Sequence, residues 1–420
     1  MDINNNSELK TIKGNIFVIY TILNLMIYIL PSLKILVPYL VAAGIMLIFL
    51  PFVFFKMQRY TSYYILIFFA AFFVSLVNVI NGLYTSYDFM NEIIRTLRFF
   101  MPVIWTLFAL RFCSSKQQNI ILLAFAVITV FILIKTILAL ETDAWIARIL
   151  AQSKTSDNAQ IRSYRMDNVG GFEFSYMIGI VVICLTWAAL KCKRILVKVI
   201  CIASAFFCYY YIIQTMYTTL LLLTSMGILL LLFFNAKSII YKISFIAVGL
   251  VLAFSAAPLF KFLSGLFTNS LLSTKFLQIY NVLSGKGLDS LGSRPGFIAN
   301  AVGNWLKSPI WGGYSTSTHT HSFIFSILER TGIIGLTAFL SCMYVSYKVI
   351  TVQLKEKSID TLLTTMVFAY IIALSVFNPI DYLFEIPIAA FFIAPVWSQF
   401  ILKNNDIKPK ADKLKHNIQK

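Results

Sequence analysis

The side chains best suited to chemistry lie in one stretch, residues 291–336, which reads LGSRPGFIANAVGNWLKSPIWGGYSTSTHTHSFIFSILERTGIIGL. It contains Arg294 directly before a proline, a Gly-Gly pair, and His319 and His321, two of the three histidines of the chain. Histidine changes protonation near neutral pH and can take a proton from a hydroxyl nucleophile. Arginine binds phosphate through two parallel hydrogen bonds. The segment therefore combines a candidate base with a candidate anion ligand.

Arg294 precedes a predicted amphipathic helix. Pro295 is favoured in the first turn of a helix, and apolar residues then recur at spacings of three and four until the chain reaches Lys307. The first backbone N–H groups of a helix are free and its dipole is positive at that end, so Arg294 and the helix start together form an anion site that fits phosphate. An arginine in this position can also cap the helix or simply face solvent. The residue pattern alone leaves both this structural role and the anion-binding role open.

His319 and His321 stand at the mouth of an apolar segment. A metal could bind such a pair, but no carboxylate lies close by in sequence to complete a site, so proton transfer is favoured over metal binding. Hydrogen bonding of interfacial histidines to their own loop is the structural alternative. Further along, Glu329 and Arg330 enter membrane depth, and adjacent residues cannot share a helix face, so each needs its own partner. Glu329 is therefore a candidate substrate ligand.

Three further cations are candidates for substrate binding. Arg162 and Arg165 lie three residues apart before a Gly-Gly pair in a polar loop, which suits an anionic headgroup. An ordinary solvated loop is the alternative. Lys135 lies within an apolar segment, where a cation is costly and is usually paired or lines a polar cavity. Alternatively, the Lys135 side chain extends along the helix until its ammonium group reaches the membrane surface.

Apolar helices must position these side chains. Hydrophobic residues make up 59% of the 420 residues and the mean hydropathy is +0.82, far above the values of a soluble domain. Apolar runs near 20 residues long span the hydrocarbon core of a bilayer, about 30 Å thick, as helices. We expect an all-α polytopic membrane protein with about twelve transmembrane helices at residues 15–33, 35–55, 61–84, 99–112, 119–140, 173–190, 195–214, 216–234, 240–258, 321–347, 360–378 and 385–402.

The expected layout has three parts. Residues 1–14 form a cytoplasmic N-terminal segment, 15–402 the transmembrane domain and 403–420 a basic cytoplasmic tail. Two long outer loops are expected at about 141–172 and 257–320, the later of them with short amphipathic helices. No thiolate pair has the spacing of a metal site, and no disulfide is expected.

Membrane topology accounts for the charge of the chain. The net charge is +18, and with the N-terminus cytoplasmic the larger share of lysines and arginines falls in the inside segments, as the positive-inside rule requires. Lipid headgroups and topology therefore explain the basicity without nucleic acid as a partner. A further amphipathic helix, predicted over 84–98, has apolar and charged residues on different faces and is expected to lie on the outer surface.

The run LGSR, KSP, GG and HTHS leading into ILERTGIIGL resembles the signature region of the O-antigen polymerase (Wzy) and O-antigen ligase superfamily of membrane glycosyltransferases. The specific match covers about 45 residues, whereas the layout of spans with a long late outer loop covers the whole chain. The resemblance implies a GT-C-like fold. It also implies an enzyme that acts on undecaprenyl-diphosphate-linked glycans at the outer face of the bacterial cytoplasmic membrane, without metal, nucleotide sugar or other cofactor.

The resemblance also implies residue roles. Arg294 matches the loop arginine assigned to the diphosphate, and His321 matches the catalytic histidine, which is usually followed by asparagine and here by Ser322. The ligase branch tends to carry an arginine after a Gln-Thr or Ser-rich start of a middle span, and the corresponding QTMY run of this chain has none. That difference favours a polymerase and leaves Arg162 or Arg165 as substitutes.

The expected function is therefore a polymerase of O-antigen (lipopolysaccharide) or capsular repeat units, with a chain-length regulator and a flippase as possible partners. One alternative is a ligase that transfers the finished glycan to the lipid A-core. Another is a flippase for the same lipid-linked oligosaccharide, which also has about twelve spans. A flippase should concentrate its charges inside the bundle in related halves, whereas this chain carries its polar residues mainly in outer loops.

Overall fold

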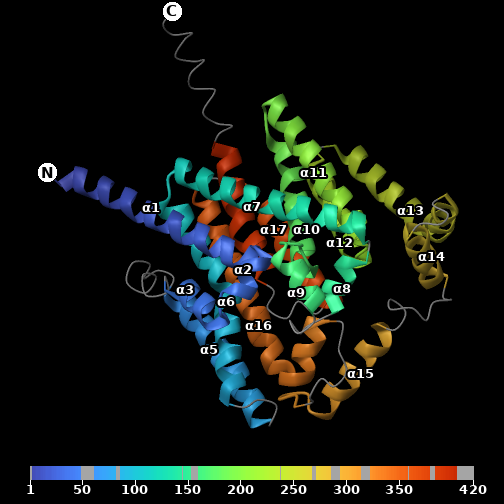
Figure 1. The fold of residues 1–420 in the computed structure, drawn as a ribbon, viewed down its shortest axis with the longest axis horizontal. Coiled ribbons are helices and arrows are strands. Elements are labelled where there is room, and N and C mark those ends of the chain that lie inside the picture. The colour runs from blue at the N-terminus through green and yellow to red at the C-terminus, as the bar shows by residue number, and fades with distance from the viewer. Residues whose placement is uncertain are drawn as a thin grey trace, which may run out of the picture.

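Helices account for nearly all of the chain in the computed structural model (Figure 1). The structure describes residues 2–48, 61–81, 86–143, 145–152, 159–236, 238–266, 271–284, 294–313, 322–357, 359–378 and 384–403. No strand occurs among these residues, so the expected all-α class is confirmed.

The described helices follow one another along the whole length of the sequence. In chain order they are α1 (Asp2–Ile29), α2 (Pro31–Leu36), α3 (Tyr39–Leu47), α5 (Thr61–Ile80), α6 (Ser86–Phe112), α7 (Ser115–Thr142), α8 (Ile146–Gln152), α9 (Ala159–Met166), α10 (Phe172–Lys191), α11 (Ile195–Thr215), α12 (Thr218–Asn235), α13 (Ile239–Leu266), α14 (Leu271–Leu283), α15 (Arg294–Lys307), α16 (Phe323–Lys355), α17 (Leu362–Phe377), α18 (Glu385–Pro387) and the π-helical stretch η2 (Ile388–Ile393). The last apolar helix continues from α18 through η2 as Glu385–Lys403.

Seven helices in the described part of the chain are long and apolar enough to cross a membrane. They are Ile93–Phe112, Ser115–Thr142, Phe172–Lys191, Ile195–Thr215, Thr218–Asn235, Phe323–Lys355 and Glu385–Lys403. Shorter apolar helices occur at Gly14–Ile29, Ile65–Val74, Ala257–Leu266 and Leu362–Phe377. The chain is therefore a helical membrane protein, as its composition predicts.

Contacts between helix ends show that several helices run back and forth between two faces of the bundle. At one of them, the Gln117 face, Gln117 near the start of α7 donates to Asn15 Oδ1 of α1 over 2.8 Å. At the same face Lys191, which ends α10, pairs with Asp360 ahead of α17 over 2.9 Å. Because α10 ends at this face and α17 begins there, these two helices run antiparallel.

The opposite ends of these helices meet at a second face, the Lys34 face. Ser32 of α2 donates to Asn168 Oδ1, which follows α9, over 2.7 Å. The backbone N–H of Phe323, at the start of α16, donates to the carbonyl of Asn378, at the end of α17, over 3.0 Å. The start of α10 and the start of α18 lie at this face too, because Lys34 reaches both.

The helix predicted over 84–98 is not separate from the span that follows it. It is the first half of α6, which continues through Pro102 to Phe112. Arg98, expected on the outer surface, has an exposed fraction of only 3%. Surface placement is therefore wrong for this part of the segment. The reason is that no turn residue separates the two runs, so the apolar side of the first continues into the apolar span and is buried with it.

The two short helices expected in the second outer loop are present as α14 and α15, and α15 has the predicted bounds. The helix before them, α13, continues through Pro258 to Leu266, past the expected start of this loop at residue 257. In Figure 1 α15 lies beside the lower part of α16.

One expected span, residues 321–347, has a different form from the one predicted. Gly332 within α16 has φ 63° and ψ −163°, which is not helical. The rings of Phe323 and Phe339 would lie about 24 Å apart along a straight helix, yet their centroids are 5.2 Å apart. The helix therefore folds back at Gly332, and a half-helix of residues 323–331 packs against the first turns of a longer helix, residues 333–355.

The turn after α15 holds this fold-back in place. The N–H of Gly313 donates to the carbonyl of Arg330 over 3.1 Å, and the N–H of Ile333 donates to the carbonyl of Pro309 over 2.9 Å. Gly312 lies between Pro309 and Gly313 in the turn and has a φ of 69°, which confirms the predicted Gly-Gly turn. Backbone groups left free where the helix breaks thus find their partners in the turn.

We expect Gly332→Ala to destabilise the protein. Its backbone region is open almost only to glycine and costs another residue about 1–3 kcal/mol. A Cβ would also collide with the carbonyl of Ile310. The matched control is Gly303→Ala in α15, where a Cβ meets no atom within 4 Å. Thermal unfolding in detergent should give a lower Tm for the first variant only; equal Tm values would contradict the fold-back.

Candidate functional site

The structure describes the flanks of the predicted site. Arg294 is the first residue of α15, as the sequence predicts, and its side chain lies outside the described part. His319 and His321 lie outside the described residues. Ser322, the next residue in the chain, is the N-cap of α16.

Ser322 fixes the start of α16 inside the bundle. It is fully buried, and its Oγ donates to the carbonyl of Ser375 over 3.3 Å and accepts from the N–H of Phe325 over 3.4 Å. The adjoining bond from Phe323 to Asn378 ties the same point to the end of α17. The segment that follows the histidines is therefore anchored at the Lys34 face.

Glu329 connects α15 to the half-helix of α16. It has an exposed fraction of 0%, and its Oε1 accepts from Asn304 Nδ2 of α15 over 2.7 Å. Arg330 instead donates from Nε to the carbonyl of Ser326 over 3.3 Å. The expectation that these adjacent residues have separate partners is confirmed. Asn304 was missed in the sequence, where it is one polar residue beside the apolar face of a helix.

The remaining predicted ligands lie on two helices, Arg162 and Arg165 on α9 and Lys135 on α7. Arg162 is exposed and Arg165 half-buried on α9, which packs against α2. Lys135 lies on the exposed face of α7, seven residues or about 10 Å before the end of that helix at Thr142. Its side chain is exposed, which fits the alternative that it extends along the helix surface.

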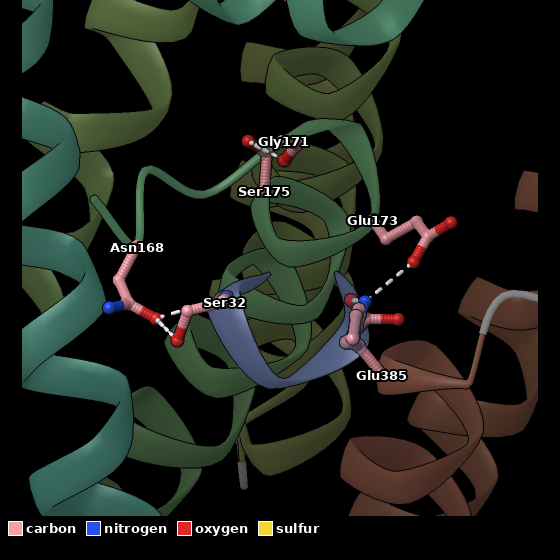
Figure 2. Close-up of polar contacts among 7 residues, drawn as sticks. Ser32, Asn168, Gly171, Glu173, Ser175 and Glu385 are labelled. Carbon is pink, nitrogen blue, oxygen red and sulfur yellow. Dashed lines mark hydrogen bonds and ion pairs between the residues drawn. The ribbon is translucent and has the colours of Figure 1, made fainter. Parts of the chain in front are cut away.

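A charged cluster that sequence reasoning missed lies at the Lys34 face. Lys34 Nζ contacts Glu173 Oε2 over 2.9 Å and also Glu385 Oε1. The exposed fraction of the side chain is 30% for Lys34 and 2% for Glu385. Figure 2 shows Glu173 and Glu385 close together on one side of α2, to the right of Ser32. The only local signal was that each of the three charges stands at the end of an apolar run.

The charges of this Lys34 cluster (Lys34, Glu173 and Glu385) affect one another. Burial lowers the pKa of Lys34 below its ordinary value, and the Glu173 carboxylate opposes that shift. Arg165 and Arg98 are close enough to lower the same pKa further. The Lys34 face therefore holds three cations and two carboxylates within mutual electrostatic reach.

Arg98 is the most buried of these cations. Its guanidinium carbon lies 3.8 Å from the ring centroid of Phe384, 4.6 Å from that of Tyr39 and 4.7 Å from that of Tyr28. Arginine is often held in this way, because the ring faces are negative and the guanidinium is weakly hydrated.

Comparisons with known proteins found no match: no family model fits the chain, and no curated protein is significantly similar to it.

We expect Lys34→Met to cost up to about 3 kcal/mol, because it leaves the buried Glu385 carboxylate without its cation. Adding Glu385→Gln should recover most of the loss. The control is Lys191→Met at the Gln117 face, which breaks the more exposed pair with Asp360 and should cost no more than about 1 kcal/mol. Thermal unfolding in detergent measures the stability of Lys34→Met, of the double variant and of Lys191→Met. Similar losses for the two lysine variants would refute the assignment of Lys34 as the cation that neutralises buried Glu385.

Removing the amide that holds Glu329 tests how α15 is docked. Asn304→Ala should lower the free energy of unfolding by about 1–3 kcal/mol, since a buried carboxylate loses its donor. Asn300→Ala, four residues earlier and exposed, should change it by no more than about 0.5 kcal/mol. If the two variants unfold at the same temperature, the Asn304 contact does not anchor the helix.

Proposed function

We propose that the chain is a membrane glycosyltransferase that polymerises O-antigen or capsular repeat units. In this proposal it transfers undecaprenyl-diphosphate-linked glycan to an acceptor sugar hydroxyl at the outer face of the bacterial cytoplasmic membrane. The observation that carries the proposal is the single segment 291–336. Arg294 begins α15, and the turn after that helix is bonded to α16, which starts two residues after His321.

The charge distribution supports the orientation in the proposal. Basic residues gather where helices meet the Gln117 face, among them Arg111, Lys191, Lys193, Arg194 and Lys355. By the positive-inside rule that face is cytoplasmic and the Lys34 face is the outer one. A GT-C-like arrangement of about twelve spans with both termini cytoplasmic belongs to the same proposal.

The proposed reaction is one displacement at the anomeric carbon of the donor. The acceptor hydroxyl oxygen forms the new bond to that carbon while the bond to the lipid diphosphate breaks. His321 takes the hydroxyl proton, as a general base. Arg294 and the free N–H groups at the start of α15 stabilise the negative charge that develops on the departing diphosphate. The proposal involves no metal, nucleotide sugar or other cofactor.

The other predicted ligands take different places in the proposal. Arg165 is the better supported of the loop arginines, since it lies near the Lys34 cluster. His319 and Glu329 are proposed substrate ligands, and the bond of Glu329 to Asn304 also holds α15 in place. Lys135 faces the outside of the bundle, which fits contact with lipid. A chain-length regulator and a flippase are the proposed protein partners.

We expect Arg294→Lys and His321→Ala each to reduce polymerisation at least about 100-fold, because the first loses the planar pair of donors and the second loses the base. The matched controls are Arg194→Lys at the Gln117 face and His416→Ala in the tail, which should retain activity. The assay supplies purified lipid-linked repeat units to proteoliposomes and resolves the products by gel.

The same assay separates the alternatives. Long chains made by both variants would sink the assignment of these residues. Transfer of glycan to an added lipid A-core acceptor without elongation would identify a ligase. Movement of the lipid-linked substrate across the bilayer without any new glycosidic bond would identify a flippase.

A further inference from the structure

Arg98 stands inside the apolar part of the protein. It is 3% exposed, and it lies five residues after Ile93, where the apolar stretch of α6 begins. That spacing corresponds to about 8 Å along the helix axis. A cation at this depth is costly and needs either a counter-charge or a route to the headgroups.

Two of the three guanidinium nitrogens of Arg98 lack a hydrogen-bond partner within the described part of the chain. Nε and Nη1 are both buried and have no hydrogen-bond partner there, and the ring of Tyr28 contacts the guanidinium. Arginine remains charged at any physiological pH, so burial cannot be relieved by losing a proton. Ring contacts balance part of the charge but accept no N–H bond of ordinary strength. An acceptor for these two donors is therefore missing among the described residues.

The neighbouring carboxylates do not supply that acceptor. Glu173 and Glu385 are both directed to Lys34, and both contacts are short enough to be ion pairs. Arg165 adds another positive charge nearby. The start of α10, which carries Glu173, also presents the positive end of a helix dipole at this face. The local field around Arg98 therefore favours an added anion.

We propose that Arg98 is the centre of a second anion site, separate from the one at Arg294, which takes a phosphate group carried by a lipid or free in solution. Phosphate oxygens accept N–H bonds from arginine with good geometry, and phosphate is the anion that a bilayer presents next to its hydrocarbon core. The site does not depend on the transferase activity, because it rests on the burial and unpaired donors of Arg98 alone.

The test measures stabilisation of the delipidated full-length protein in neutral detergent. Phosphatidylglycerol or inorganic phosphate is added at matched ionic strength, with sodium chloride as the reference. For the wild type we expect at least one phosphate source to raise the Tm by about 3 °C or more. Arg98→Gln should lose that rise. Arg111→Gln, an exposed arginine at the other end of α6, should keep it.

Each outcome has one meaning. A rise with phosphatidylglycerol alone assigns the site to a lipid headgroup, and a rise with inorganic phosphate assigns it to the free anion. No rise with either source, or the same rise in Arg98→Gln, overturns the proposal. If Arg98→Gln does not fold, Arg98→Lys keeps the charge while removing the planar donors; a smaller rise supports the site and an unchanged rise overturns it.

A carboxylate of the chain itself is the competing partner. Asp381 lies outside the described residues, three positions before Phe384. Asp381→Asn should leave the phosphate-dependent rise intact. A wild type that ignores both phosphate sources, combined with equal loss of Tm in Asp381→Asn and Arg98→Gln, would identify an internal ion pair and overturn the proposal.

Discussion

The backbone contact between the Gly-Gly turn and the break in α16 is the constraint on which the rest of the candidate site depends. A helix that breaks in apolar surroundings exposes N–H and C=O groups that lipid cannot satisfy. Here Pro309 and Gly313 supply those partners to Ile333 and Arg330. One set of bonds therefore stabilises the fold-back and at the same time fixes α15, with Arg294 at its start, against the helix that follows the histidines.

Charge is handled differently at the two faces of the bundle. At the Gln117 face the basic side chains are largely exposed, and their pairs, such as Lys191 with Asp360, remain partly in solvent. At the Lys34 face a buried carboxylate, Glu385, and a buried guanidinium, Arg98, lie among aromatic rings. Burying an unpaired charge costs on the order of several kcal/mol. The Lys34 face therefore carries more of the cost of burying charge than the Gln117 face does.

Local signals predicted part of this structure. The bounds of α15 and the Gly-Gly turn follow from residues within a few positions of each other, and both were predicted correctly. The fold-back at Gly332 could not be predicted, because a lone glycine in an apolar run is also compatible with a straight helix and its partner lies about 20 residues earlier in the chain. The Lys34 cluster joins three segments that are far apart in sequence. Arg98 was misplaced because burial depends on neighbours that α6 does not contain.

The half-helix of residues 323–331 is held at both ends, by Asn378 at its start and by the turn after α15 at its finish. Adding or deleting one residue between these anchors would rotate one end by about 100° relative to the other and shift it by about 1.5 Å. Asn378 and the turn after α15 cannot move together to accommodate such a change, because they belong to different helices. The length of this short element is therefore fixed, and natural variants of the chain should differ here by substitution and not by insertion.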